Sequence, residues 1–140
     1  MLLGFIEEVG QNAPFAVGIY YGTGKPYNAN EYLNDLDIEM GHIRKDGLEF
    51  RGHRYNVKIN GFLCDLPARS FIKLIICFNG YLGCHYCNQE GEYINAVVFP
   101  ELNCPLRSDE SFREQVDQGH HKGLSILTNL NIDMVRDFHP

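Results

Sequence analysis

The organisation of this chain is decided by one stretch, residues 58–73, which reads KINGFLCDLPARSFIK. Its apolar residues run up to Cys64, and the lone carboxylate of Asp65 follows them directly. Pro67 then opens a helix, because proline lacks the N–H that would stay unpaired at the first helical position. The stretch therefore predicts a strand that leads into a helix, with Asp65 facing either the helix start or a bound cation.

Apolar periodicity divides the rest of the chain into alternating strands and helices. The chain has 140 residues, of which 44% are hydrophobic and 21% charged, enough for one folded domain with a single core. We expect the first strand to be buried on both faces, and Asn28 or Asn30 to cap the first helix. The predicted strands are 15–21, 48–50, 54–64 and 92–100, and the predicted helices are 31–40, 67–78 and 108–115. Their order indicates an α/β fold in which helices flank a sheet.

The charge of the chain is unevenly distributed. The net charge of -6 argues against indiscriminate binding to polyanions by the chain as a whole. Residues 41–73, however, carry seven basic side chains against three acidic ones, a local balance of +4. This region is the candidate contact for DNA, although solvation of surface cations is the commoner reason for such a pattern. No membrane contact is expected, because the longest apolar run, 71–78, is too short to span a bilayer.

The cysteines indicate a reducing compartment. Their number, five, is odd, and the N-terminus carries no basic lead of the kind that a secretory signal has. We therefore expect a nuclear or cytoplasmic protein that is not secreted, in which cysteines are core residues, nucleophiles or metal ligands.

Two of these cysteines have the spacing of a metal knuckle. Cys84 and Cys87 lie two residues apart after a glycine, so both sulfur atoms can face one ion. His120 and His121 are the obvious source of the remaining ligands of a structural zinc ion, and His85 or Cys104 is the alternative. A buried pair of reduced thiols explains the spacing equally well. A redox pair fits less well, because such pairs usually stand at a helix start after a strand.

Asp65 is the candidate for catalysis. A carboxylate at the end of a central strand lies where α/β sheets present oxygen ligands to Mg²⁺. Capping of the following helix is the commoner role for an aspartate in this position. Phosphoryl transfer with two metal ions needs several carboxylates close together. Four acids lie elsewhere in the chain, and nothing in the spacing selects among them: Asp35, Asp37, Glu92 and Asp133.

Six blocks of the sequence together resemble DDE-type cut-and-paste DNA transposases and their domesticated relatives in animal genomes. The blocks are 14–26 (PFAVGIYYGTGKP), 64–71 (CDLPARSF), 80–87 (GYLGCHYC), 91–94 (GEYI), 99–109 (FPELNCPLRSD) and 120–123 (HHKG). The resemblance covers nearly the whole chain, from about residue 4 to its end. It implies a partial ribonuclease-H-like mixed sheet over 1–78, a zinc-binding insertion over 79–123 and a C-terminal segment over 124–140.

The resemblance also implies which residues bind metal ions and which metal-binding acids are missing. Asp65 matches the second of the three acids that bind two Mg²⁺ ions in the family, and the Cys84–Cys87 and His120–His121 blocks match what looks like its zinc-binding insertion. The first and third acids lie outside these 140 residues, so the resemblance implies a chain truncated at both ends. We therefore expect no nuclease or transposition activity from this polypeptide alone, because one acid holds Mg²⁺ weakly. The alternative is a small zinc-stabilised module that binds DNA or protein.

Overall fold

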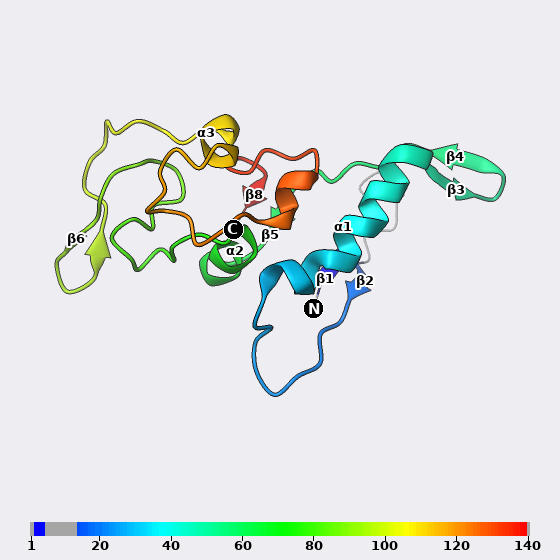
Figure 1. The fold of residues 1–140 in the computed structure, drawn as a ribbon, viewed down its shortest axis with the longest axis horizontal. Helices are drawn as coiled ribbons and strands as arrows, with labels where there is room; N and C mark the ends of the chain where they lie inside the picture. The colour runs from blue at the N-terminus through cyan, green and yellow to red at the C-terminus, as the bar shows by residue number, and fades with distance from the viewer. Residues whose placement is uncertain (1, 5–13, 140) are drawn as a thin grey trace.

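The structure, a computed structural model, describes residues 2–4 and 14–139 of the chain (Figure 1). It is mixed α/β, as expected. The α-helices are α1 (Ala29–Asp46), α2 (Leu66–Lys73) and α3 (Asp109–Arg113), and η1 (Ile126–Asn129) is a 3₁₀ helix. The strands are β1 (Leu2–Gly4), β2 (Phe15–Gly18), β3 (Leu48–Phe50), β4 (His53–Tyr55), β5 (Phe62–Leu63), β6 (Glu92–Tyr93), β7 (Val97–Val98) and β8 (Phe138–His139).

These strands pair in twos. β1 with β2, β3 with β4, and β6 with β7 form antiparallel pairs, whereas β5 and β8 are parallel. Within the described residues the single mixed sheet expected from the sequence is therefore not formed. The strand predicted over 92–100 is divided, because Asn95 takes a left-handed backbone (φ 62°) that turns the chain between β6 and β7.

The first predicted strand is shorter and far more exposed than expected. β2 ends at Gly18. Val17 and Ile19 are both exposed, and Tyr20 lies edge-on to Tyr32 of α1 at 6.1 Å between ring centroids. The prediction of burial on both faces is wrong, because β2 pairs with β1 on one side and the residues described around it do not cover both of its faces.

Helix α1 is capped as the sequence indicates. The side chain of Asn28 accepts hydrogen bonds from the backbone N–H groups of Asn30 and Glu31, and the helix runs on to Asp46, six residues beyond the prediction. Leu33 is fully buried on its inner face. The amide of Asn30 ties the helix to the C-terminal part of the chain, since it donates to the carbonyl of Leu124 and accepts from the N–H of Ile126.

Helix α2 begins as predicted and ends early. Asp65 is its N-cap and Pro67 lies in its first turn. Leu74 adopts a left-handed conformation (φ 53°), and its N–H bonds back to the carbonyls of Ser70 and Phe71, so the helix stops at Lys73 instead of residue 78. The apolar residues of this segment are unevenly buried: Ile72 and Ile75 are buried, whereas Phe71 and Ile76 are half-buried.

The hydrophobic core lies where α1, α2, α3, η1 and β8 meet (Figure 1). Its buried members are Leu33, Ile72, Ile75, Phe112, Leu127, Leu130, Ile132, Met134, Val135 and Phe138. Five of the ten come from 130–138, although only one residue of that segment, Phe138, belongs to a strand. The segment therefore needs polar contacts from elsewhere to keep its apolar side chains inward.

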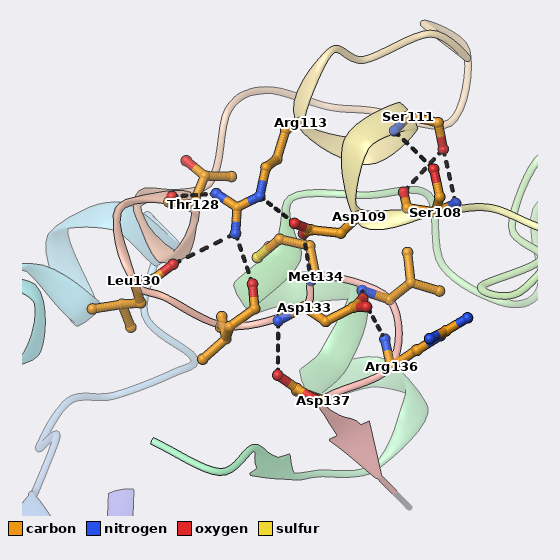
Figure 2. Close-up of polar contacts among 12 residues, drawn as sticks. Ser108, Asp109, Ser111, Arg113, Thr128, Leu130, Asp133, Met134, Arg136 and Asp137 are labelled. Carbon is orange, nitrogen blue, oxygen red and sulfur yellow. Dashed lines mark hydrogen bonds and ion pairs between the residues drawn. The ribbon is translucent and has the colours of Figure 1, made fainter. Parts of the chain in front are cut away.

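Arg113 supplies most of those contacts. Its guanidinium donates to the carbonyls of Thr128 (2.5 Å) and Ile132 (2.7 Å), with a longer contact to Leu130 (Figure 2). It also pairs with Asp109 one helical turn earlier, Nε to Oδ2 at 2.7 Å. A cation at the carbonyl end of η1 is favourable, because the unpaired carbonyls there carry partial negative charge. We call this set of contacts the Arg113 clamp.

The clamp continues through Asp109 into the turn before β8. Asp109 Oδ1 accepts a hydrogen bond from the N–H of Met134 at 2.8 Å. Asp133 then caps the turn by accepting from the N–H groups of Val135 and Arg136, and Asp137 Oδ2 accepts from the N–H of Asp133 (Figure 2). After this turn, Phe138 lies in the core, where its ring stacks on that of Phe62 from β5 at 5.3 Å between centroids.

Replacement of Arg113 by alanine should lower the free energy of unfolding by about 3 kcal/mol, because several backbone carbonyls lose a charged donor and the core segment loses its tether. Urea denaturation followed by circular dichroism measures the change. Arg136→Ala is the matched control, since Arg136 is exposed and should change stability by less than about 0.5 kcal/mol. Equal effects of the two substitutions would contradict the role given to the clamp.

Candidate functional site

Asp65 lies just beyond the carboxyl end of a parallel strand pair. The N–H of Phe62 donates to the carbonyl of Asp137 at 2.7 Å, and the N–H of Cys64 donates to the carbonyl of His139 at 3.0 Å. The carboxyl ends of β5 and β8 therefore meet at one edge, with Asp65 exposed beside it. One carboxylate oxygen accepts the N–H of Ala68 at 2.7 Å, which is the N-cap bond of α2.

The other acids named in the sequence analysis have separate positions. Asp133 caps its own turn, and Asp37 on α1 accepts from the side chain of Asn129 at 3.1 Å. Asp35 also lies on α1, and Glu92 is an exposed residue of β6. In the described ranges, 2–4 and 14–139, no three His, Cys, Asp or Glu side chains are grouped so that they could hold a metal ion. Among those residues, Asp65 therefore acts as a helix cap without a cluster of carboxylates.

The cysteine knuckle forms a cluster of thiols that includes Cys104, one of the alternative ligands considered from the sequence. The sulfur atoms of Cys84 and Cys87 are 3.2 Å apart. The side-chain amide of Gln89 donates to Cys87 at 3.1 Å and approaches Cys104 at 3.5 Å. Burial raises the pKa of Cys87, but hydrogen bonds from Cys104, Gln89 and Cys84 outweigh burial and hold that pKa at about 7. The spacing of the first two cysteines was a sufficient signal for the pair, whereas Cys104 was only an alternative.

The pair is close to the geometry of two zinc ligands. Two sulfur ligands of a tetrahedral zinc ion lie about 3.8 Å apart when each Zn–S bond is about 2.3 Å. The separation of 3.2 Å in the cluster is that of a hydrogen-bonded thiol pair, and it needs to open by about half an ångström to match. Two sulfur donors therefore lie close together, but in the described residues no third Cys, His, Asp or Glu is placed with them to hold a metal ion.

The two adjacent histidines lie in different surroundings from the cysteine cluster. His120 is fully buried, and its Nδ1 lies 2.7 Å from the carbonyl oxygen of Leu82, so Nδ1 carries the proton. The other ring nitrogen, Nε2, is buried with no hydrogen-bond partner among the described residues. His121 packs edge-on against Phe112 at 4.7 Å, and its Nδ1 is likewise buried and unpaired within that part of the chain. Bare imidazole nitrogens of this kind are the atoms that bind metals.

His85 and Ser70 form a buried pair that could be mistaken for a catalytic one. Ser70 Oγ lies 3.1 Å from His85 Nε2, and it donates its own hydrogen to the carbonyl of Leu66 at 2.9 Å. Because the hydroxyl hydrogen is already used, His85 Nε2 must be the donor to Ser70, and it cannot act as a base toward it. The pair is therefore structural.

Two buried cations on α2 were missed by the sequence analysis. Lys73 is 1% exposed, and its ammonium lies 4.9 Å from the ring centroid of Phe138 and 5.0 Å from that of Phe112. Burial, with Arg69 and Arg107 nearby, lowers the pKa of Lys73 to about 8. Arg69 is equally buried and donates to the hydroxyl of Tyr86 at 3.0 Å. The available signal was their spacing of four, which places both on the helix face that carries Ile72 toward the core.

Comparisons with protein-family models, with curated proteins and with solved structures gave no match. Over the part of the chain that is described, no helix has both the length and the apolar character needed to cross a membrane.

The buried histidines should make the metal-free protein sensitive to acid. Burial lowers the pKa of His85 to about 3 and that of His120 to about 4, so both stay neutral in the folded protein. In the unfolded chain they bind protons near their ordinary pKa of about 6.5. Their contribution to stability is therefore complete above about pH 6.5 and is lost as the pH falls toward 4.

We expect the free energy of unfolding, measured with urea in the presence of a chelator, to fall between pH 7.5 and pH 5. His85→Gln should flatten this dependence, whereas substitution of the exposed His53 by glutamine should not. A free energy of unfolding that stays constant over that range would contradict the lowered pKa values of the two buried histidines.

Proposed function

We propose that this chain derives from the catalytic domain of a DDE-type cut-and-paste DNA transposase, that its cysteine cluster holds a structural zinc ion, and that the polypeptide does not cleave DNA by itself. The observation that carries the proposal is the position of Asp65. It follows a strand whose neighbour is parallel, and it opens a helix whose first turn contains Pro67. In α/β proteins this edge is where ligands bind.

The absence of cleavage is proposed from the surroundings of Asp65 in the described residues. Two-metal catalysis stabilises both the attacking and the leaving oxygen, and it requires carboxylates that hold two ions about 4 Å apart. Within those residues, Asp133 and Asp37 are committed to contacts elsewhere, and no metal-holding group is present. One exposed aspartate supplies too little charge to hold two magnesium ions at that edge.

The zinc proposal rests on the donors of the cluster. Cys84 and Cys87 supply two adjacent sulfur atoms, and the third thiol, Cys104, lies within the same hydrogen-bond network. The described residues do not group a third ligand with the pair, so a side chain has to move toward it when the ion binds. His120 has its tautomer set by the carbonyl of Leu82, which leaves Nε2 free to bind. Zinc bound there would cross-link the loop before β6 to the segment after α3. All five cysteines are free thiols, which supports a nuclear or cytoplasmic location.

The zinc proposal is tested by the metal content of the purified protein, measured by mass spectrometry of the elements. We expect equimolar zinc in the wild type and loss of zinc in both Cys84→Ser and Cys87→Ser. Cys77→Ser is the matched control, because Cys77 takes no part in the thiol cluster.

Comparison of Cys104→Ser with His120→Asn then identifies which side chain completes the site, since only a true ligand should release the metal. A wild-type protein that purifies without zinc, and gains none on incubation with it, would remove the zinc proposal.

The proposed lack of catalysis is tested by incubating the protein with supercoiled plasmid and Mg²⁺. We expect no nicking by the wild type. Asp65→Asn is the control, because asparagine is an equally good helix cap and preserves α2. Nicking by the wild type that disappears in this variant would overturn the proposal.

A second candidate is a zinc-stabilised module that binds nucleic acid without chemistry. One observation favours it, namely the exposed hairpin of β3 and β4, which projects away from the core (Figure 1). Its sequence contains basic and aromatic residues. The two candidates are compatible, because loss of catalysis does not require loss of binding.

A further inference from the structure

The β3–β4 hairpin, residues 48–55, is a well-defined extension of helix α1. The register pairs Leu48 with Tyr55, and the two-residue turn consists of Arg51 (φ 51°) and Gly52 (φ 76°). Two successive left-handed residues give a turn whose twist matches that of the strands, so the hairpin is closed without strain on its pairing. In Figure 1 it projects from the end of α1 opposite to the core.

The base of the hairpin is held against the helix by Gly47. This residue ends α1 with φ 75°, and its N–H donates to the carbonyl of Ile43 at 2.8 Å. A Cβ at this position would lie 2.8 Å from Cγ of Arg54, so the stem of Arg54 packs directly on the glycine. The hairpin is therefore joined to α1 by a close contact as well as by the chain.

One face of the hairpin is aromatic and exposed. Residues that are directly paired across an antiparallel ladder share a face, so Leu48 and Phe50 lie on the same side as His53 and Tyr55. Phe50 is 58% exposed and Tyr55 is 49% exposed. The guanidinium of Arg51 lies 5.2 Å from the centroid of the Phe50 ring. In the described residues this face is left open to solvent.

The same hairpin lies within residues 41–73, where basic side chains outnumber acidic ones. Its exposed cations and those beside it are Lys45, Arg51, Arg54 and Lys58, and the exposed acids among them are Asp46 and Glu49. Asp46 is the last residue of α1, and the next acid back along the helix, Glu39, is also exposed. At 1.5 Å per residue, Glu39 lies about 9 Å from Lys45 along the axis, close to the screening length of about 8 Å at physiological salt. The hairpin and its flanks therefore keep a modest excess of positive charge, four cations against two acids.

We propose that the β3–β4 hairpin binds single-stranded nucleic acid, with unpaired bases stacked on Phe50 and Tyr55 and phosphates beside Arg51 at the turn and Lys58 beyond β4. The inference deepens the proposed function, because it names the element that contacts nucleic acid, and it rests on that function for the choice of this polyanion. Exposed rings alternating with cations are what single-strand binding proteins use, since every base has a face that stacks. Contact with duplex phosphates alone would leave the aromatic face without a role.

Binding is measured by fluorescence anisotropy with a labelled 20-nucleotide oligothymidylate, a 20-base-pair duplex and anionic phosphatidylserine vesicles as alternative ligands. We expect the single strand to bind most tightly. Phe50→Leu combined with Tyr55→Leu should weaken that binding at least tenfold and leave its salt dependence unchanged. Arg51→Gln and Lys58→Gln together should reduce the slope of log K against log salt by about 1.4.

Two controls are available in the same molecule. Tyr93→Leu replaces a ring that is 68% exposed on a different antiparallel pair, β6–β7, and Lys122→Gln removes an exposed cation outside 41–73. Both should bind like the wild type. Tighter binding to the duplex that is unaffected by loss of the rings, binding to vesicles in place of nucleic acid, or equal losses in the controls would each overturn the proposal.

A second measurement keeps the test valid if the leucine variants are unstable. The chain contains no tryptophan, so Phe50→Trp introduces a unique fluorophore at the proposed stacking position. Oligothymidylate should quench its emission, whereas heparin, a polyanion without bases, should not. The same substitution at Tyr93 should show no quenching by either. The zinc and nicking experiments use Cys84 and Asp65, so a failure of the hairpin proposal is separate from a failure of the proposed function.

Discussion

The guanidinium of Arg113 fixes the path of the chain from η1 to β8, and the arrangement of the core depends on that path. Its ion pair with Asp109 is about one-third exposed and contributes little by itself. The larger contribution comes from the donation to the carbonyls of Thr128 and Ile132, which have no regular ladder to bind them. Because alternate residues of 130–134 are buried, a segment held by these carbonyls points Leu130, Ile132 and Met134 inward.

The position of Asp65 also depends on these contacts, because Asp65 follows β5 and β5 pairs with β8. Asp109 pairs with Arg113 and also accepts a hydrogen bond from the N–H of Met134, which fixes the start of the next turn. That turn is capped by Asp133, and it places Phe138 beside Phe62. The two strands share only a few hydrogen bonds, so their parallel alignment depends on the turn that precedes β8. The edge at which Asp65 stands is therefore built by residues more than forty positions later in the sequence. A function proposed for that edge requires the C-terminal segment as well as the aspartate.

Local features of the fold could be predicted from the sequence, and features set by distant contacts could not. The caps of α1 and α2 were predicted, because Asn28 and Asp65 act on backbone groups within three residues of themselves. The end of α2 at Leu74 was missed, since a left-handed leucine is held there by its surroundings and has no signature in the sequence. The exposure of β2 was missed for a related reason. An apolar run shows which residues are suited to burial, but whether other elements cover them depends on tertiary contacts.

In the candidate site, too, local features could be predicted from the sequence and features set by distant contacts could not. The spacing of Cys84 and Cys87 was enough to bring their sulfur atoms together, whereas Cys104 joins them only because Gln89 contacts both loops. The burial of Lys73 between two rings could not be foreseen, because Phe112 and Phe138 come from other elements. Whether His120 shares a metal with the cysteines is likewise a matter of tertiary placement, which spacing along the chain does not determine.

Hydrogen exchange at two backbone amides tests the central claim most directly. The N–H groups of Phe62 and Cys64 donate to the carbonyls of Asp137 and His139, and these bonds exist only if the C-terminal segment is seated against β5. The account predicts that both amides exchange as slowly as those of the buried helix α2, through global unfolding. Exchange of both at the rate of the exposed hairpin β3–β4, while α2 stays protected, would show that β8 is not held beside Asp65 and would contradict the account.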